Sequence, residues 1–181
     1  MWTKLFFSIL LIATYLNTYA VSTKISDELF GIQLGSEYKT LTKNYKFVKV
    51  KSVAGADKVY KIVYTESFGI ETYLHFFKSK VYKIKLVYGK NFADETDWEN
   101  IYNQTKLNYG EYLSAVTNTE EKNYTETYTW QDENIKQILE KVSNNNVLET
   151  FSVLIVDKKI ETEILKISPL QKFWQNIISI F

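Results

Sequence analysis

Apolar and polar residues alternate along residues 71–89, which read ETYLHFFKSKVYKIKLVYG. Two alternating runs, rich in β-branched and aromatic residues, flank a short polar break at Lys78-Ser79-Lys80. A period of two over this length predicts a β-hairpin with one buried face, at the centre of an antiparallel sheet. The residues expected in the core, beneath helices, are Thr72, Leu74, Phe76, Tyr82, Ile84, Leu86 and Tyr88.

The other face of this hairpin is the predicted binding surface. Its candidate residues are Tyr73, His75, Phe77, Lys83 and Lys85. Aromatic side chains on a sheet face that meets water are typical of a contact surface. The competing interpretation is that the second half of the chain simply covers this face.

Further strands are predicted on both sides of the hairpin. They are expected at residues 29–35, 47–50, 59–65, 125–130, 135–142, 151–156 and 160–164, the last two forming a hairpin around Asp157-Lys158-Lys159. One short helix should begin after Ser36 and continue to about Asn44, because Ser is a favourable N-cap. A second should begin at Asp94 or Thr96 and end at Tyr109-Gly110, where glycine terminates helices. The fold class is therefore α+β, an antiparallel sheet with short helices packed on one face.

Each half of the chain then contains a short helix followed by about four strands. This order predicts two αββββ pseudo-repeats, at about 29–90 and 91–167, within one domain at 21–167. The segments FFKSKVYKIKL and LIVDKKIETEI would occupy equivalent places. The alternative is one continuous meander with two helices on one face.

The first 20 residues, MWTKLFFSILLIATYLNTYA, have the pattern of a signal peptide. A lysine precedes an apolar run of about 12 residues, short of the ~20 that span a bilayer. Thr18 and Ala20 are small enough for a cleavage site. The pattern predicts export to the periplasm or outside the cell, and an uncleaved N-terminal anchor is the competing interpretation.

The last segment, residues 168–181, is predicted to be an amphipathic helix that begins near Pro169. Its apolar residues recur at helical spacing: Leu170, Phe173, Trp174, Ile177, Ile178 and Phe181. Such a helix either packs on its own sheet or binds a membrane surface or a protein partner.

Composition narrows the chemistry. The chain has no Cys, so it forms no disulfide, which in an exported protein is compatible with a bacterial envelope. All 22 basic residues are Lys, and the missing Arg fork weakens any phosphate or nucleic-acid interpretation. Residues 37–90 carry 12 Lys against 4 acidic residues, whereas 91–167 carry 7 Lys against 15 acidic residues. This asymmetry either holds two lobes together or is only the charge of two solvated surfaces.

No catalytic or metal motif is evident. His75 is the single histidine, and the acidic cluster at 94–99 lacks calcium-loop spacing and better suits a helix N-terminus. No phosphate loop, G-x-S-x-G or H-E-x-x-H occurs, so we expect no cofactor and no metal.

The run GIQLGS at 31–36, entering a short helix and then the hairpin FFKSKVYKIKLVY, resembles an exported α+β group. This group includes the outer-membrane assembly lipoproteins and the tandem β-lactamase-inhibitor-protein-like domains. The helix end at Tyr109-Gly110 and the strand end at Trp130-Gln131-Asp132 are similar to those of small bacterial envelope proteins of this type. The resemblance implies helices on one face of an antiparallel sheet and a binding or scaffolding role without catalysis. The chain departs from the group in having no lipobox Cys and no Pro after Gly110.

The sequence therefore favours an exported, non-enzymatic binding or envelope-scaffold protein that acts through its sheet face or its terminal helix. A carboxylate-dependent hydrolase and a host-facing surface protein are the alternatives. The partner would be a protein or a membrane surface, and not a nucleic acid. Oligomeric state is left open.

Overall fold

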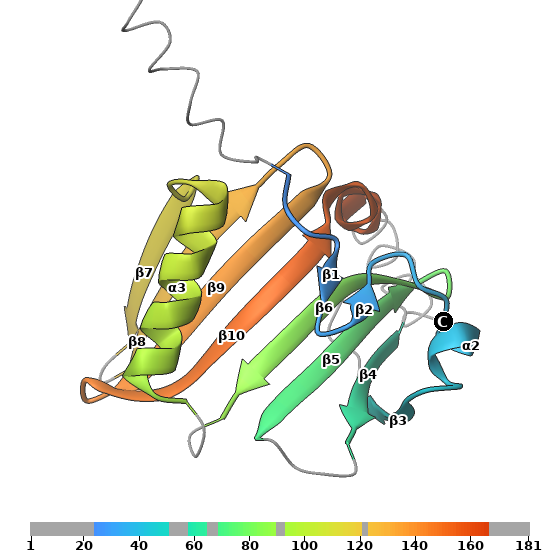
Figure 1. The fold of residues 1–181 in the computed structure, drawn as a ribbon, viewed down its shortest axis with the longest axis horizontal. Coiled ribbons are helices and arrows are strands. Elements are labelled where there is room, and N and C mark those ends of the chain that lie inside the picture. Colours follow the sequence, from blue (N-terminus) through green and yellow to red (C-terminus); the bar gives the residue numbers. More distant parts are fainter. Residues whose placement is uncertain (1–23, 51–57, 65–68, 90–92, 121–122, 167–181) are drawn as a thin grey trace, which may run out of the picture.

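The computed structural model describes residues 24–50, 58–64, 69–89, 93–120 and 123–166. Their dominant feature is an eight-stranded antiparallel sheet with the strand order β3-β4-β5-β6-β10-β9-β8-β7 (Figure 1). The predicted α+β class with an antiparallel sheet is confirmed. The alternative of one continuous meander is wrong, because the consecutive strands β6 and β7 lie at the centre and at the edge of the sheet.

The first four strands of this sheet lie next to one another and form one half of it. Their bounds are β3 Lys46–Val50, β4 Lys58–Val63, β5 Ile70–Phe77 and β6 Lys80–Tyr88. Lys78 and Ser79 connect β5 to β6 and both have positive φ, which is the geometry of a tight hairpin turn. The central hairpin predicted from 71–89 is therefore confirmed.

The last four strands form the other half of the sheet. Their bounds are β7 Ser114–Glu120, β8 Asn123–Gln131, β9 Ile135–Asn144 and β10 Val147–Asp157. Asn145 and Asn146, both at positive φ, form the β9–β10 turn, and asparagine tolerates this conformation better than most residues. β10 joins the two halves of the sheet, since it pairs with β6 as well as β9.

Helix α3, Glu95–Tyr109, lies across one face of the sheet (Figure 1). The Asp94 side chain caps it, accepting a hydrogen bond of 2.7 Å from the Asp97 backbone N–H. Gly110 ends it at a φ of 80°, a conformation that glycine adopts without a Cβ penalty. Trp98 anchors the first turn by packing against Phe151 of β10. The predicted boundaries of this helix are confirmed.

The N-terminal elements lie on the same face as α3. The predicted 29–35 strand is instead two short strands, β1 Glu28–Leu29 and β2 Ile32–Gln33, joined by Phe30 and Gly31 at positive φ. Helix α2 is shorter than expected, Tyr38–Leu41, and its N-cap residue is Glu37 rather than Ser36. Tyr38 packs its ring against Phe47 and Tyr60, which fixes α2 over the β3–β4 edge.

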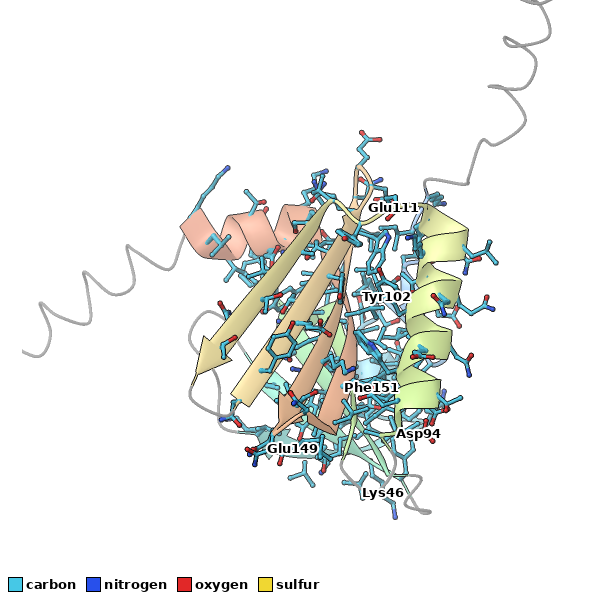
Figure 2. All side chains as sticks on the ribbon, turned by 90° about the vertical axis from the view of Figure 1, so that its left-hand side faces the viewer. Lys46, Asp94, Tyr102, Glu111, Glu149 and Phe151 are labelled. Atoms are coloured by element: carbon cyan, nitrogen blue, oxygen red, sulfur yellow. The ribbon has the colours of Figure 1, made fainter. Side chains whose placement is uncertain are left out.

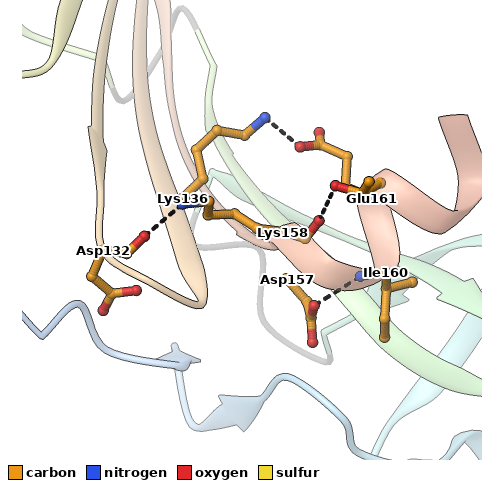
Figure 3. Close-up of polar contacts among 7 residues, drawn as sticks. Asp132, Lys136, Asp157, Lys158, Ile160 and Glu161 are labelled. Atoms are coloured by element: carbon orange, nitrogen blue, oxygen red, sulfur yellow. Dashed lines mark hydrogen bonds and ion pairs between the residues drawn. The ribbon is translucent and has the colours of Figure 1, made fainter.

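The predicted hairpin around Asp157-Lys158-Lys159 is wrong. Residues 158–166 are helical, and the Asp157 carboxylate caps the helix by accepting a 3.0 Å hydrogen bond from Ile160 N–H (Figure 3). The spacing of Ile160 and Ile164 fits a helix as well as a strand, because i and i+4 share a helix face. The proposed equivalence of FFKSKVYKIKL and LIVDKKIETEI therefore fails.

The 158–166 helix also corrects the prediction that the helices pack on one face. It lies on the opposite side of the sheet from α3, as Figure 2 shows. Ile164 is buried there with Phe77, Tyr82 and Val156. The signal-peptide prediction for 1–20 and the terminal helix at 168–181 lie outside the described residues.

One residue of the central hairpin has the wrong predicted face. Tyr82 was expected in the core with Leu74 and Ile84, but it lies on the opposite side, with Phe77. The pairing shifts between His75 and Phe76, whose partners are Lys83 and Val81, so Tyr82 is an extra residue in β6. The bulge places Val81 in the core instead. The other predicted core residues of the hairpin are on the predicted side, with Tyr88 half-buried.

Candidate functional site: the sheet face opposite α3

The sheet face that points away from α3 carries the binding residues predicted from the sequence, and we call it the far face. One row of cross-strand neighbours runs over it from β4 to β7: Lys61, Tyr73, Lys85, Leu154, Ile138, Thr129 and Ser114. Paired residues point to the same side of an antiparallel sheet, so this row defines the face. Apart from Leu154, which is buried, these residues are half-buried or exposed.

The 158–166 helix covers one end of the far face. Phe77, a predicted binding residue, is only 8% exposed because Ile160 and Ile164 pack against its cluster. Lys136 of β9 donates a 2.5 Å hydrogen bond to Glu161, which fastens this helix to the sheet (Figure 3). The interpretation that the second half of the chain covers the face thus holds at this end, and Phe77 is not available for contact there.

Away from that helix, Glu71 organises a polar cluster on β4 and β5. Its carboxylate accepts hydrogen bonds from the Lys61 ammonium and, at 2.5 Å, from the Tyr73 hydroxyl. The bond from Lys61, followed by that from Tyr73, lowers the pKa of Glu71. Burial and the adjacent carboxylate raise the pKa of Tyr73 to about 12. Tyr73 is therefore a hydrogen-bonded phenol held in a fixed position on the surface.

His75 and Lys83 are cross-strand partners, both half-buried. Burial, with the charges of Lys83 and Lys85 added, lowers the pKa of His75 to about 4. Burial and the neighbouring Lys85 also lower the pKa of Lys83. Tyr82 packs its ring edge-on against the imidazole at 6.1 Å. His75 is thus a neutral member of the sheet face at physiological pH.

Lys85 and Glu140 form an ion pair near the middle of the far face, with 3.2 Å between the nitrogen and the oxygen. Ser152 of β10 donates a hydrogen bond of 3.4 Å to the same carboxylate. The three residues come from β6, β9 and β10, so the ion pair spans the junction between the two halves of the sheet. This contact uses the opposite charges of the two halves of the sequence.

The structure brings Tyr73, His75, Lys83 and Lys85 together on adjacent strands, as the hairpin pattern predicted. Sequence reasoning missed Glu71 and Glu140. Glu71 has the same parity as Tyr73, so extending the alternation by one step would have found it. Glu140 could not be found in this way, because its position depends on β9 lying beside β10 and β10 beside β6.

Strand β7 was also missed. Its sequence, SAVTNTE, has only two strongly β-favouring types and no run of apolar residues. Its far-face residues Ser114, Val116 and Asn118 are exposed. With β8 they extend the face by a polar, threonine-rich region.

Two further observations concern metals and membranes. Within the described ranges, no three or more His, Cys, Asp or Glu side chains are grouped so that they could hold a metal ion. The helices of the same ranges are too short or too polar to cross a membrane. The terminal-helix candidates, Leu170, Phe173, Trp174, Ile177, Ile178 and Phe181, lie outside these ranges.

Comparison with protein-family models finds no match, and comparison with curated proteins finds none either.

Proposed function

We propose that this chain is an exported, non-enzymatic binding protein that holds a protein partner on its far face. The observation that carries the proposal is the row from Lys61 to Ser114, which places lysine, tyrosine, aliphatic and hydroxyl side chains along one continuous surface. Contact surfaces of proteins combine such aromatic anchors with a polar surround. Export rests on the signal-peptide pattern of residues 1–20.

The arrangement of the two halves of the sheet, β3–β6 and β7–β10, supports a tandem origin for this surface. Helix α2 precedes β3–β6, and α3 precedes β7–β10. Each set of four strands runs in chain order from an edge to the centre, where β6 and β10 pair antiparallel. We propose that these sets are two αββββ pseudo-repeats, as in the tandem domains that the sequence resembles, and that the partner contacts both.

The state of the carboxylates favours binding over hydrolysis. A general acid needs a raised pKa, whereas Glu71 accepts two hydrogen bonds that lower its pKa. Glu140 is ion-paired with Lys85. Both carboxylates have the environment of fixed recognition groups.

The test exchanges the charges of the central pair. The double variant Lys85→Glu/Glu140→Lys keeps an ion pair between β6 and β9 but reverses its polarity towards a partner. The matched control, Lys106→Glu/Glu111→Lys, reverses the 2.8 Å pair at the end of α3. Residues 21–181 of each protein serve as bait in envelope extract, and thermal unfolding confirms that each folds.

We expect wild type and the α3 control to retain the same partner, and the far-face exchange to lose it by about tenfold or more, since reversed charges oppose their former complements. A partner that binds all three proteins equally would refute the far-face proposal. A partner lost only by the α3 control would place the binding surface on the helix side.

A further inference from the structure

A cavity of about 330 Å³ lies on the helix side of the sheet, away from the far face. Its wall is α3, its floor is formed by β6, β9 and β10, and Leu29 of β1 closes the opposite side. Figure 1 shows α3 and β1 on the same face of the sheet, with β10 between them in the view. The volume is at the lower end of the roughly 300–1,000 Å³ that small-molecule sites occupy.

The lining of this cavity contains no charged side chain. Leu29, Leu86, Ile101 and Val153 give it apolar surfaces, and the remaining residues are amides, one threonine and two tyrosines. A charged ligand would lose part of its hydration here without gaining an opposite charge, which is unfavourable. The lining therefore selects an uncharged, mainly apolar molecule.

Gln137 supplies the polar end of the site. It is only 8% exposed, and its Nε2 donates a hydrogen bond of 3.4 Å to the Thr105 hydroxyl. That hydroxyl in turn donates to the Ile101 carbonyl at 2.8 Å. Because the Thr105 hydrogen is already used, the hydroxyl can only accept from Gln137, which fixes the orientation of the amide.

This orientation leaves the Gln137 amide oxygen without a hydrogen-bond donor among the described residues. This oxygen is not fully buried, because among the described side chains only Asn144 Oδ1 is a buried polar atom without a partner. The Gln137 oxygen is therefore accessible at the cavity, where a bound molecule can supply the donor. Gln137 lies on the floor, where a ligand entering between α3 and β1 would meet it.

We propose that this cavity binds a neutral, mainly aliphatic small molecule that ends in a hydroxyl or primary amide. The donor end meets the Gln137 amide oxygen, and the aliphatic part lies against Leu86, Val153 and Ile101. The site is independent of the far face, from which it is separated by the sheet.

The experiment titrates residues 21–181 with octanamide, 1-octanol and sodium octanoate, and follows backbone amide resonances by NMR. We expect saturable shifts at β6, β9 and β10 with octanamide and octanol, and binding of octanoate at least about tenfold weaker, because its charge remains unpaired. Octanoate binding as tightly as octanamide, or neither neutral compound binding, would overturn the proposal.

Two substitutions on α3 locate the site. Ile101→Phe adds bulk at the cavity wall, whereas Leu107→Phe adds the same ring at a position that is 73% exposed. Octanamide binding should be lost in the first variant and kept in the second. Equal binding by both would also contradict the assignment.

A third substitution, Gln137→Leu, removes the acceptor while keeping a similar volume. It should weaken octanamide by about three- to tenfold, the usual effect of one hydrogen bond. Unchanged octanamide affinity would disprove the role of Gln137. The far-face exchange Lys85→Glu/Glu140→Lys should leave octanamide binding intact, so failure of this proposal and failure of the proposed function are distinguishable.

Discussion

His75 shows how the sheet environment changes a single residue. Its strand neighbours are Val59 of β4 and Lys83 of β6, and its imidazole makes an edge-on contact with the Tyr82 ring and is near Lys85. Burial and two neighbouring ammonium groups make its protonation unfavourable. The single histidine of the chain is thus held neutral at physiological pH.

This environment predicts a pH dependence of stability. The folded-state pKa of His75, about 4, is below its ordinary value of 6.5, so the unfolded chain binds the extra proton between these values. The free energy of unfolding should therefore fall as pH drops from about 6.5 to 4, by up to about 3 kcal/mol. Urea denaturation across this range measures it. The His75→Gln variant should lose most of the dependence, and an unchanged slope would exclude His75 as its source.

Asp132 links three parts of the molecule. Its carboxylate accepts hydrogen bonds from the backbone N–H groups of Ile25, Asn134 and Ile135, at 2.6 to 2.8 Å. Burial alone would raise its pKa, but these donors, together with Lys158, lower it. Lys158 also donates to the Asp132 carbonyl at 2.6 Å (Figure 3).

Asp132→Ala should reduce the free energy of unfolding by about 2–3 kcal/mol, because it leaves backbone donors unpaired. Asp132→Asn keeps one acceptor oxygen and should lose less. The neighbouring exposed residue supplies the control, since Glu133→Ala should change stability by under about 0.5 kcal/mol. Chemical denaturation measures the free energy of unfolding of each variant. Equal values for Asp132→Ala and Glu133→Ala would show that the hydrogen bonds to the Asp132 carboxylate do not stabilise the fold.

At the scale of elements, local signals were enough for α3 and for the β5–β6 turn, but not for α2, where the predicted Ser36 N-cap was wrong. The Asp94 cap and the Gly110 terminator define α3, and the polar break at 78–80 marks the β5–β6 turn. They failed where one pattern fits two structures. The segment IETEI alternates like a strand but also places Ile160 and Ile164 on one helix face, and tertiary packing against Phe77 and Tyr82 decides between them.

The bulge in β6 could not be predicted from the alternation of apolar and polar residues. Nothing in VYKIK distinguishes a regular strand from one with an extra residue, because the choice depends on how β6 pairs with β5. This single shift moved Tyr82 across the sheet and Val81 into the core. The sequence could not predict the cavity over Gln137 either, since its lining comes from five separate elements.

The 158–166 helix should depend on its buried isoleucine. Ile164→Ala removes a side chain that is 8% exposed and should cost about 2–4 kcal/mol, through lost burial and the cavity it leaves. Leu165→Ala, at a position that is 66% exposed, is the matched control and should be nearly neutral. Thermal denaturation compares the two, and equal effects would mean that the helix does not pack as described.

For the whole molecule, the pairing of β6 with β10 makes one sheet from two chain halves of opposite net charge. Six residue pairs connect the strands, from Phe151↔Tyr88 to Val156↔Lys83. Among the described residues, ion pairs also connect the halves: Lys85–Glu140 and the longer Lys78–Glu163 at 3.5 Å. The charge asymmetry seen in the sequence therefore contributes contacts at this junction.

A shared sheet predicts cooperative unfolding. In a Trp2→Phe/Trp174→Phe background, fluorescence comes from Trp98 and Trp130, both in the second half. Far-UV circular dichroism reports both halves. The two urea transitions should coincide, because separating β6 from β10 disrupts both halves of the sheet. A circular dichroism transition that separates from the fluorescence transition would instead show two independently folding halves.

The most direct test of the far-face account is site-specific photo-crosslinking in the living cell. A photoreactive phenylalanine is placed at Tyr73 or Val116 on the far face, and at Leu107 on the exposed side of α3. If the far face holds the partner, the two far-face positions should crosslink the same protein and Leu107 should not. Crosslinks from Leu107 alone, with none from Tyr73 or Val116, would contradict the far-face proposal.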